Sequence, residues 1–434
     1  MLHGLLRLFL VLLTICYSLA RRKTSAELLD AQQRGAPFGA HKLEVRTDFR
    51  SDIADHLVSE WNLRNACVTF HNWRGTLHRA QFVSLENISA VIHSFSEYSF
   101  GFGRLAFVRP AESTDAPALA QCEKRSLGLA LTVSSNNLYH QFFHAVPAFE
   151  ALLRYVQPDA VFVPLVSYMA TSWLHPATNY SHAWEFSLRA LSSAPAKQLM
   201  EDTLRLFDAP CTCFERVEGA TGAVSLFYPK ARPRILAFCR QAVKMARSMP
   251  PRAPLPMEER ASLGGPVNVL YVRRGGIKRA LANDAEVSRA VCAGRARRTD
   301  PHAEWVAECV TLERLTLASQ MRTLASASVM LGVHGQAMVW MPFMLADRPR
   351  AAVVEIRMPK LAGGKRSVSD RNMYGAIASA LGIYHTPLTG ELAAGCNTNK
   401  DVLGCNVTVA VPTLLQALSS SAVHVSASPS RRHR

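Results

Sequence analysis

The chain has 434 residues, which is too long for one ordinary hydrophobic core and fits two domains with a tether. Hydrophobic residues make up 49% of the chain and charged residues 19%, which excludes a mainly disordered protein. The formal net charge of +16 suits acidic partners such as nucleotide phosphates, acidic glycans, membrane surfaces or nucleic acid. A basic, solvated surface without any such partner explains the charge equally well.

The N-terminal residues predict entry into the secretory pathway. An apolar run at residues 8–20 is followed directly by Arg21, Arg22 and Lys23. The run is shorter than the roughly 17–25 residues of a membrane-spanning helix, and it has the length of a signal-peptide core. Residues 1–20 are therefore either a signal anchor, which would attach the protein to the membrane, or a signal peptide cleaved after Ala20. Both alternatives place the remaining chain in the lumen of the endoplasmic reticulum or the Golgi.

Sequons and cysteines agree with a luminal protein. Three Asn-X-Ser/Thr sequons, which are acceptors of N-linked glycans, begin at Asn87, Asn179 and Asn406. Of the ten cysteines, all but Cys16 follow the apolar run, and in an oxidising lumen they are expected to pair. Their number is odd, so at least one should be free or bonded to another chain. Cys396 and Cys405 are close enough in sequence to close a short loop, whereas Cys211-Thr212-Cys213 lacks a second half for a zinc site.

The first half of the chain predicts a stem and then an α/β domain. Residues 21–65 are charged and weakly periodic, as a stem would be, and the domain is expected over residues 66–249. Within it, residues 128–133 and 160–165 are apolar runs typical of buried strands. An amphipathic helix is expected between them, from residue 138 to 155, with a kink or a restart at Pro147. Strand, helix and strand in this order form the βαβ unit of an α/β fold.

A linker and a second α/β domain follow. Residues 250–266 are rich in proline and glycine and predict the linker. The second domain, over residues 267–420, is expected to contain strands at 267–272, 328–333 and 351–356 and helices at 311–325 and 337–345. Residues 421–434 predict a basic, disordered tail. Two α/β domains joined by a hinge form a cleft, and ligands of open parallel sheets bind beyond the C-terminal ends of the strands.

Residues just after the predicted strands therefore carry the candidate site. His334 and Gly335 follow the strand at 328–333 and open a helix, where backbone N–H groups and the helix dipole favour an anion. Arg273, Arg274 and Arg279 follow the strand at 267–272, and guanidinium groups pair well with phosphate. A tight turn with a satisfied histidine and a basic surface loop are the structural alternatives.

Two further patterns concern acidic and histidine side chains. Glu355 is a lone acid in an apolar strand, where a carboxylate needs a partner, which is either a ribose hydroxyl pair or a neighbouring arginine. His140 and His144 have the spacing of the HExxH zinc motif, but Gln141 stands where that motif has glutamate. The chain also lacks a P-loop, a GxSxG elbow and a DxD metal motif. A metalloprotease, a P-loop enzyme and a DxD-dependent transferase are thus disfavoured.

Three segments in order resemble glycosyltransferase family 61, whose members include plant β-1,2-xylosyltransferases, xylan arabinosyltransferases and animal O-linked N-acetylglucosaminyltransferases. The first segment runs from Asn137 through His140 to Pro147, and the second is the arginine-rich stretch at residues 273–287. The third runs from Leu315 to Ile356. It passes from a helix into the strand ending in Gly332-Val333-His334-Gly335, then through a short helix at 338–342 to the strand with Glu355. The resemblance covers roughly residues 136–358.

The resemblance implies a GT-B-like fold, with two Rossmann-like domains facing a cleft, and an inverting transfer from a UDP-sugar without an essential metal. It implies that Arg273, Arg274 and Arg279 bind the donor diphosphate together with His334 and the Gly335 turn, while Glu355 reaches the nucleoside. His140 would face the cleft from the acceptor side. Xylose, arabinose or N-acetylglucosamine would pass to a glycan or glycoprotein acceptor in the Golgi or endoplasmic reticulum.

The chain departs from the family pattern at functional positions. Ala337 stands where a second glycine is usual, and His144 where an aspartate is common. If that aspartate were the catalytic base, His144 would have to replace it, since a histidine can accept a proton near neutral pH. A non-catalytic luminal protein that binds glycan or nucleotide is therefore the alternative function. Nucleic acid is not expected as a partner, because the chain lacks a motif of aromatic and basic residues.

Overall fold

The computed structural model describes residues 56–73, 77–86, 88–96, 101–133, 138–166, 182–224, 226–227, 229–249, 266–274, 280–293, 297–300, 303–359, 372–394, 396 and 405–427. The predicted signal or anchor at 1–20, residues 21–55 of the predicted stem, and residues 250–265 of the predicted linker lie outside these ranges. Within the described ranges, no helix has the length and apolar composition needed to cross a bilayer.

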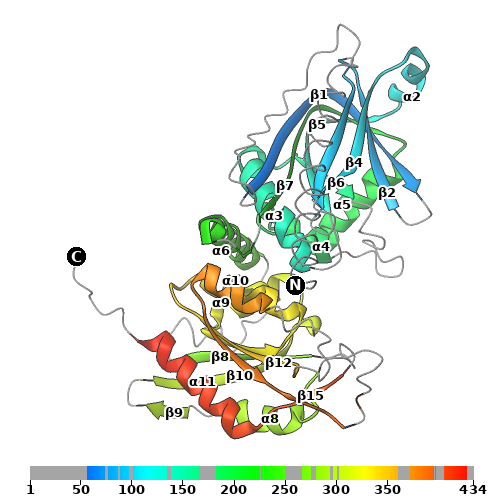
Figure 1. Ribbon diagram of the computed structural model, residues 1–434. Coiled ribbons are helices and arrows are strands. Elements are labelled where there is room, and N and C mark those ends of the chain that lie inside the picture. The colour runs from blue at the N-terminus through cyan, green and yellow to red at the C-terminus, as the bar shows by residue number, and fades with distance from the viewer. Residues whose placement is uncertain are drawn as a thin grey trace, which may run out of the picture.

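The structure is an α/β fold built on two large sheets, which lie at opposite ends of the molecule in Figure 1. The first sheet has the strand order β3-β4-β2-β1-β7-β5-β6. Its strands are β1 (His56–Trp73), β2 (Leu77–Ser84), β3 (Ala90–Ser96), β4 (Gly101–Pro110), β5 (Glu123–Val133), β6 (Val161–Val166) and β7 (Thr212–Val224). Strands β5, β6 and β7 run parallel, whereas β1 pairs antiparallel with both β2 and β7. The α/β prediction is confirmed, and this sheet is mixed.

Helices of the first half cover both faces of its sheet. They are η1 (Ser113–Asp115), α2 (Ala116–Leu119), α3 (Leu138–Leu152), η2 (Leu153–Tyr155), α4 (His182–Leu188), α5 (Ala196–Asp208), η3 (Pro229–Ala231) and α6 (Arg232–Ser248). The predicted βαβ unit is β5-α3-β6, in which Gly128 pairs with Val161 and Val133 with Val166. Helix α3 runs through Pro147 without a break, so of the two alternatives at this proline the restart is wrong, and the kink stays a prediction.

The second sheet has the order β13-β12-β11-β8-β10-β9, and all of its strands are parallel except β9. Its strands are β8 (Val267–Arg273), β9 (Arg297–Asp300), β10 (Ala303–Thr311), β11 (Val329–Val333), β12 (Ala352–Arg357) and β13 (Tyr384–Thr389). A separate small pair is formed by β14 (Glu391–Leu392) and β15 (Val407–Thr408). The helices are α8 (Asp284–Val291), η4 (Leu312–Arg314), α9 (Leu317–Ser326), η5 (Gln336–Leu345), α10 (Met373–Leu381) and α11 (Val411–Ser426).

Several predicted boundaries need correction. Strand β1 begins at His56, within the predicted stem, because residues 56–64 pair with the distant strand β7, which local periodicity does not reveal. Helix α11 continues to Ser426, and burial of Ser421 and Ala422 keeps the first residues of the predicted tail in the fold. Residue 311 belongs to β10, and the helix expected at 311–325 begins at Leu317, after the N-cap Thr316. The division into two domains at residues 250–266 stays a prediction.

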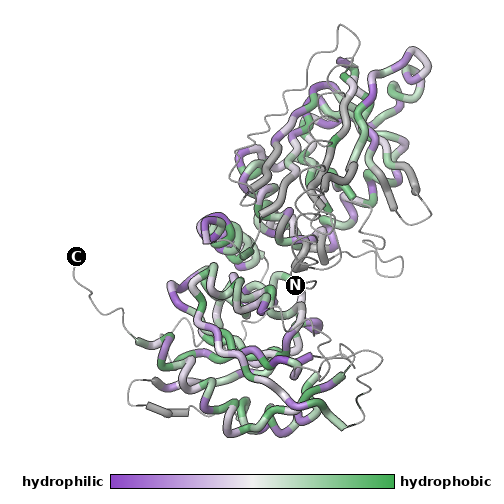
Figure 2. Tube along the Cα trace, in the orientation of Figure 1, coloured by the Kyte–Doolittle hydropathy of each residue, from purple (hydrophilic) through white to green (hydrophobic). Residues whose placement is uncertain are grey.

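One hydrophobic core joins the layers between the two sheets. It runs from Leu129 and Leu131 of β5, through α3, α4 and α6, to α9, η5, α10 and the strands β8 and β11. Helices α6, α9 and α10 lie between the sheets in Figure 1, and Figure 2 shows hydrophobic stretches along the strands of both sheets. Ring contacts cross this layer, since Phe142 of α3 lies 5.8 Å from Phe343 of η5 and Phe186 of α4 lies 5.8 Å from Trp340, centroid to centroid. The two halves therefore bury aromatic surface against each other.

Four disulfides link strands and loops. They are Cys67–Cys213, Cys122–Cys211, Cys292–Cys309 and Cys396–Cys405. The predicted short loop at Cys396 and Cys405 is confirmed, and so is the expectation of an unpaired cysteine, because Cys239 is free and buried. Several disulfides are typical of an oxidising, secretory-type environment.

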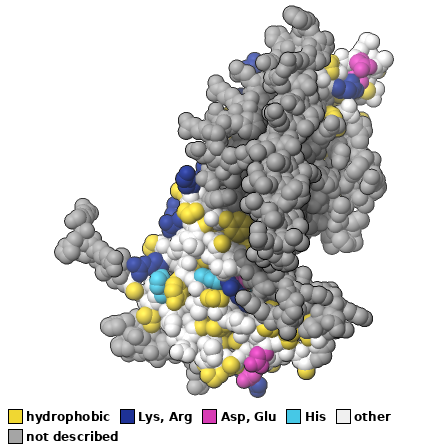
Figure 3. Space-filling model, viewed as in Figure 1, with side chains coloured by type: hydrophobic (Ala, Val, Ile, Leu, Met, Phe, Trp, Pro, Cys, Tyr) yellow, Lys and Arg dark blue, Asp and Glu magenta, His cyan; other side chains and the backbone are white. Residues whose placement is uncertain are grey.

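The basic side chains are dispersed on the face that Figure 3 draws. Lys and Arg side chains of the described residues lie there singly or in small groups over both ends of the molecule. Among the described residues of this face, the basic side chains are therefore not gathered into one patch. The absence of a nucleic-acid partner stays a prediction.

Candidate functional site

The parallel order of β12, β11 and β8 brings three of the predicted segments to one edge of the second sheet. Gly332 of β11 pairs with Val272 of β8 on one side and with Glu355 of β12 on the other. All three strands point the same way, so the residues that follow them meet at their common C-terminal edge. His334, Arg274 and Glu355 are therefore neighbours in space, although up to 81 positions separate them in sequence (355 − 274).

His334 and Glu355 form a buried hydrogen-bonded pair, which we call the His334–Glu355 dyad. The distance from His334 Nδ1 to Glu355 Oε1 is 2.5 Å, and the two side chains are 3% and 0% exposed. The backbone N–H of His334 donates to the carbonyl of Ile356 at 2.8 Å, and Tyr374 packs edge-on against the imidazole at 5.0 Å between ring centroids. These contacts fix the ring plane, and Nδ1–H is the donor that a carboxylate requires. The hydrogen bond described for the ring uses Nδ1, which leaves Nε2 as the ring atom for a ligand.

Glu355 also binds two partners that sequence reasoning missed. His385 Nε2 of β13 lies 2.8 Å from Glu355 Oε2, and Arg357 Nε donates to the same oxygen at 2.9 Å. Burial by itself would raise the pKa of Glu355, but hydrogen bonds from His334 and His385 and the charge of Arg357 outweigh it and hold the pKa well below its usual range. Glu355 is therefore an ionised carboxylate whose two oxygens are engaged inside the protein. The sequence left a ribose hydroxyl pair and a neighbouring arginine as alternative partners of Glu355, and the structure has the arginine, Arg357.

Gly335 and Arg274 lie in direct contact. A Cβ added to Gly335 would be 2.8 Å from Arg274 Nη1, and the backbone of Gly335 has φ 157° and ψ −171°. The positive φ favours glycine here, and the guanidinium end of Arg274 lies where a side chain would begin. Gly335 precedes η5, and its carbonyl accepts from the N–H of Met338 at 2.9 Å. The predicted turn thus places a cation and the N-terminal end of a helix beside the His334–Glu355 dyad.

Replacing Gly335 with alanine is expected to lower the free energy of unfolding by about 1–3 kcal/mol, the usual cost of backbone strain and a close contact. Urea denaturation of the two single variants Gly335→Ala and Arg274→Ala and of the double variant measures it. Because the alanine methyl meets Arg274, the double variant should lose less stability than the sum of the two single variants. Additive losses would contradict the contact.

Arg273 has a different role from its neighbour. Its Nε donates to Asp284 Oδ2 at 3.0 Å, its Nη2 also reaches Asp284, and the hydroxyl of Tyr271 donates to Asp284 Oδ1 at 2.7 Å. Burial and the neighbouring carboxylate raise the pKa of Tyr271, so this hydroxyl remains a proton donor. The Arg273 guanidinium therefore anchors the start of α8. Arg279, the third predicted arginine, lies outside the described residues.

His140 and His144 lie on α3, one turn apart, in a helix that is intact over this span. His144 is buried at 7% exposure, and the side chain of His140 is outside the described part of the structure. Gln141 has a structural role, since its amide donates to the carbonyl of Thr132 at 2.9 Å and contacts the Ser187 hydroxyl. Helix α3 packs against η5, which begins directly after Gly335. A direct contact of either histidine with His334 is not among the contacts described.

One sequon can be placed. Asn406 precedes β15, and its Oδ1 accepts from the backbone N–H of Ala280 at 3.0 Å, so this residue ties the C-terminal segment to the chain before α8. Asn87 and Asn179 lie outside the described residues.

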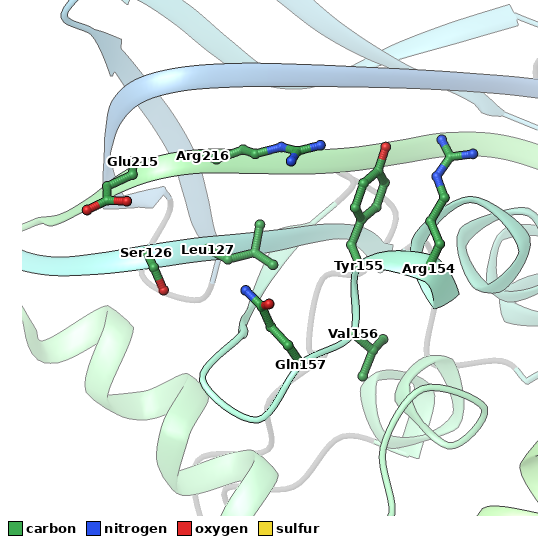
Figure 4. A pocket seen from close by; sticks show the side chains of 8 residues that line it. All are labelled: Ser126, Leu127, Arg154, Tyr155, Val156, Gln157, Glu215 and Arg216. Carbon is green, nitrogen blue, oxygen red and sulfur yellow. The ribbon is translucent and has the colours of Figure 1, made fainter.

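One cavity among the described residues lies away from this site. It has a volume of about 310 Å³ and is lined by residues of β5, η2 and β7 in the first sheet. Figure 4 shows Tyr155 between the guanidinium groups of Arg154 and Arg216, which lie 4.8 Å and 4.9 Å from the ring centroid. None of the predicted site residues lines this cavity.

A scan against protein-family models finds no match for this chain, and a search of curated proteins finds no significantly similar sequence.

Proposed function

We propose that the protein is an inverting glycosyltransferase that moves xylose, arabinose or an N-acetylglucosamine-class sugar from a UDP-sugar to a glycan or glycoprotein acceptor. The observation that carries the proposal is the His334–Glu355 dyad beside Arg274 and Gly335, at the C-terminal edge of a parallel sheet. This is where open parallel sheets bind ligands, and an anion is the ligand that a guanidinium, an imidazole and a helix N-terminus share.

The chemistry of the transfer fits these groups. An acceptor oxygen forms a bond to the anomeric carbon, the bond from that carbon to the phosphate oxygen breaks, and UDP leaves with an added negative charge. Arg274 and the backbone at Gly335 would bind the diphosphate, and protonated His334 would donate from Nε2 to a phosphate oxygen. The Glu355 carboxylate accepts from Nδ1–H and fixes the orientation of that ring, which leaves Nε2 for the ligand. These groups supply positive charge to the leaving group, a task that a metal ion performs in many transferases.

The acceptor hydroxyl must lose a proton during the reaction, which requires a base within reach. We assign this role to the α3 side of the site, because α3 packs on η5 and carries His140 and His144. In this proposal the two sheets belong to a GT-B-like pair of domains, with the donor on the second and the acceptor on the first. The disulfides support a luminal location, which we propose to be the Golgi or endoplasmic reticulum.

Donor binding is the direct test of this site. Thermal unfolding of the chain from Arg21 onward, in EDTA, is measured with UDP-, GDP- and CMP-sugars. A donor present at 100 times its dissociation constant adds about 2.7 kcal/mol to the free energy of unfolding. We expect stabilisation by UDP-sugars and a loss of about 1.5–3 kcal/mol of binding free energy in Arg274→Ala, the usual contribution of hydrogen bonds to a charged group.

Arg289→Ala is the matched control, because Arg289 is an exposed arginine on the neighbouring helix α8. It should bind donors as the unmodified chain does. An equal loss in both variants would point to general electrostatic attraction, and no stabilisation by any donor would contradict the donor site. Donor binding without transfer to any acceptor would favour the second candidate, a non-catalytic nucleotide- or glycan-binding protein. Ala337 and His144, where the chain departs from the family pattern, motivate this candidate.

A further inference from the structure

Four cysteines from three separate parts of the chain lie together at one end of the first sheet. Cys67 of β1 pairs in register with Cys213 of β7, and Cys122, just before β5, is bonded to Cys211, just before β7. The sulfur atoms of Cys67, Cys122 and Cys213 all lie within 4.8 Å of one another. The two disulfides are therefore adjacent. Three of their four sulfurs form a close group, and the fourth, that of Cys211, is bonded to Cys122; we call these four residues the tetracysteine cluster.

The backbone holds this cluster without help from the disulfides. Strands β1 and β7 pair from His56 and Val224 to Val68 and Thr212, which keeps Cys67 opposite Cys213. Strand β5 pairs with β7 from Glu123 and Thr212 onward, and the N–H of Glu123 donates to the Cys211 carbonyl at 3.2 Å. Reduction of both disulfides would thus leave the four thiols close together.

The arrangement meets the requirements of a zinc site. A tetrahedral zinc with Zn–S bonds of about 2.3 Å has its sulfurs roughly 3.8 Å apart, a spacing that the sulfurs of Cys67, Cys122 and Cys213 approach. The Cys211 side chain would turn toward them once its bond to Cys122 is broken. Cys67, Cys122 and Cys211 are buried, whereas Cys213 is partly exposed and offers a path of entry. Cys67 and Cys122 also supply the second half that Cys211 and Cys213 lack in the sequence.

We propose that the reduced chain binds one zinc ion through the thiolates of Cys67, Cys122, Cys211 and Cys213. Each disulfide accepts two electrons and two protons from a dithiol reductant, which itself becomes a disulfide. Zinc then displaces the four thiol protons and links β1, β5 and β7 in place of the two S–S bonds. The inference is independent of the proposed transferase activity, because none of these cysteines belongs to the donor site.

Cobalt(II) is the probe for this site, because tetrahedral cobalt thiolates absorb in the visible region and cobalt occupies zinc sites. The protein is reduced with excess dithiol under argon, freed of reductant, and titrated with cobalt(II) and then zinc(II). We expect visible absorbance that saturates at one cobalt per chain and is abolished by one equivalent of zinc. Folding of the reduced protein is checked by circular dichroism. Folded, reduced protein without this absorbance would overturn the proposal.

Two paired variants locate the metal. Cys67→Ser/Cys213→Ser leaves only two thiols in the cluster and should lose the absorbance, whereas Cys292→Ser/Cys309→Ser removes a distant pair and should keep it. Absorbance that survives in the first variant would overturn the proposal. If that variant fails to fold, alkylation of the reduced wild-type chain decides the matter. Zinc should then protect the four cluster cysteines in peptide maps, and protection confined to other cysteines would contradict the site.

Discussion

Replacing His334 with alanine is expected to reduce sugar transfer by about 10²–10⁴-fold, the usual contribution of a positioned proton donor or acceptor. The imidazole is buried, its ring plane is fixed by Glu355 and Tyr374, and Nε2 is the only ring nitrogen left for a ligand among the described contacts. An alanine removes that nitrogen and leaves Arg274 as the nearest cation to the leaving diphosphate. The measurement is the initial rate of UDP release at saturating donor and acceptor.

The matched control is His424→Ala, because His424 is an exposed histidine on α11 that stacks on Tyr384 at 4.2 Å between ring centroids. This variant should transfer sugar at the unmodified rate. The replacement His334→Gln separates two roles, since glutamine can still donate a hydrogen bond but cannot carry a positive charge. If the hydrogen bond from His334 is what matters, His334→Gln should recover part of the rate that His334→Ala loses; if the charge of His334 is what matters, the two variants should be equally slow.

An unchanged rate in His334→Ala would remove the dyad from catalysis. An unchanged dissociation constant for UDP in the same variant would further show that Nε2 does not contact the donor. The two measurements separate a residue that binds the ground state from one that acts mainly in the transition state.

The positions of the candidate site residues, directly after strands, could be predicted because the signal for a buried strand is local in the sequence. Each of the segments that begin at Arg273 and His334 follows a short apolar run, and an apolar run bounded by glycine or charged residues is a strong signal for a buried strand. Parallel pairing then brings the strand ends together. The same rule predicted the β5-α3-β6 unit, whose strands have continuous apolar runs.

The partners of Glu355 could not be predicted, because they depend on which strands become neighbours. His385 reaches the carboxylate because β13 pairs with β12, and it stands in a segment, Tyr384-His385-Thr386, without any local sign of function. Arg357 lies two residues beyond Glu355 on the same strand, so alternation along a strand, which puts both side chains on one face, was the signal that could have found it. The tetracysteine cluster was missed for the same reason as His385, since Cys67 and Cys213 are 146 positions apart.

The role of Arg273 could not be predicted from the local density of positive charge. A run of cations around two glycines predicts phosphate binding for every arginine in it, yet the first one pairs with Asp284 eleven positions later. That aspartate was visible in the sequence, but a pairing across a turn into α8 depends on the conformation of the turn. Successive side chains along a strand point to opposite faces of the sheet. Arg273 is the last residue of β8 and Arg274 follows it, so the two side chains were expected to have different surroundings.

Glu355→Ala is expected to lower the free energy of unfolding by about 3–5 kcal/mol, the range for breaking a buried ion pair by removing one partner. The substitution leaves two imidazoles and a guanidinium without their shared acceptor in a region where Glu355 itself is 0% exposed. Urea denaturation at neutral pH measures the loss. The control is Glu60→Ala, because Glu60 pairs with Arg154 at the surface, with side chains 45% and 58% exposed, where ion pairs contribute about 0–1 kcal/mol.

The loss should depend on pH with a definite sign. The folded state holds the pKa of Glu355 below its ordinary range, so on acidification the unfolded chain binds the proton first. The stabilising contribution of the carboxylate is therefore complete above the ordinary glutamate pKa of about 4.3 and disappears as the pH falls through the lower folded value. The difference in unfolding free energy between the unmodified protein and Glu355→Gln should shrink as the pH falls from about 7 to about 3. A difference that stays constant would mean that Glu355 stabilises the fold through its shape rather than its charge.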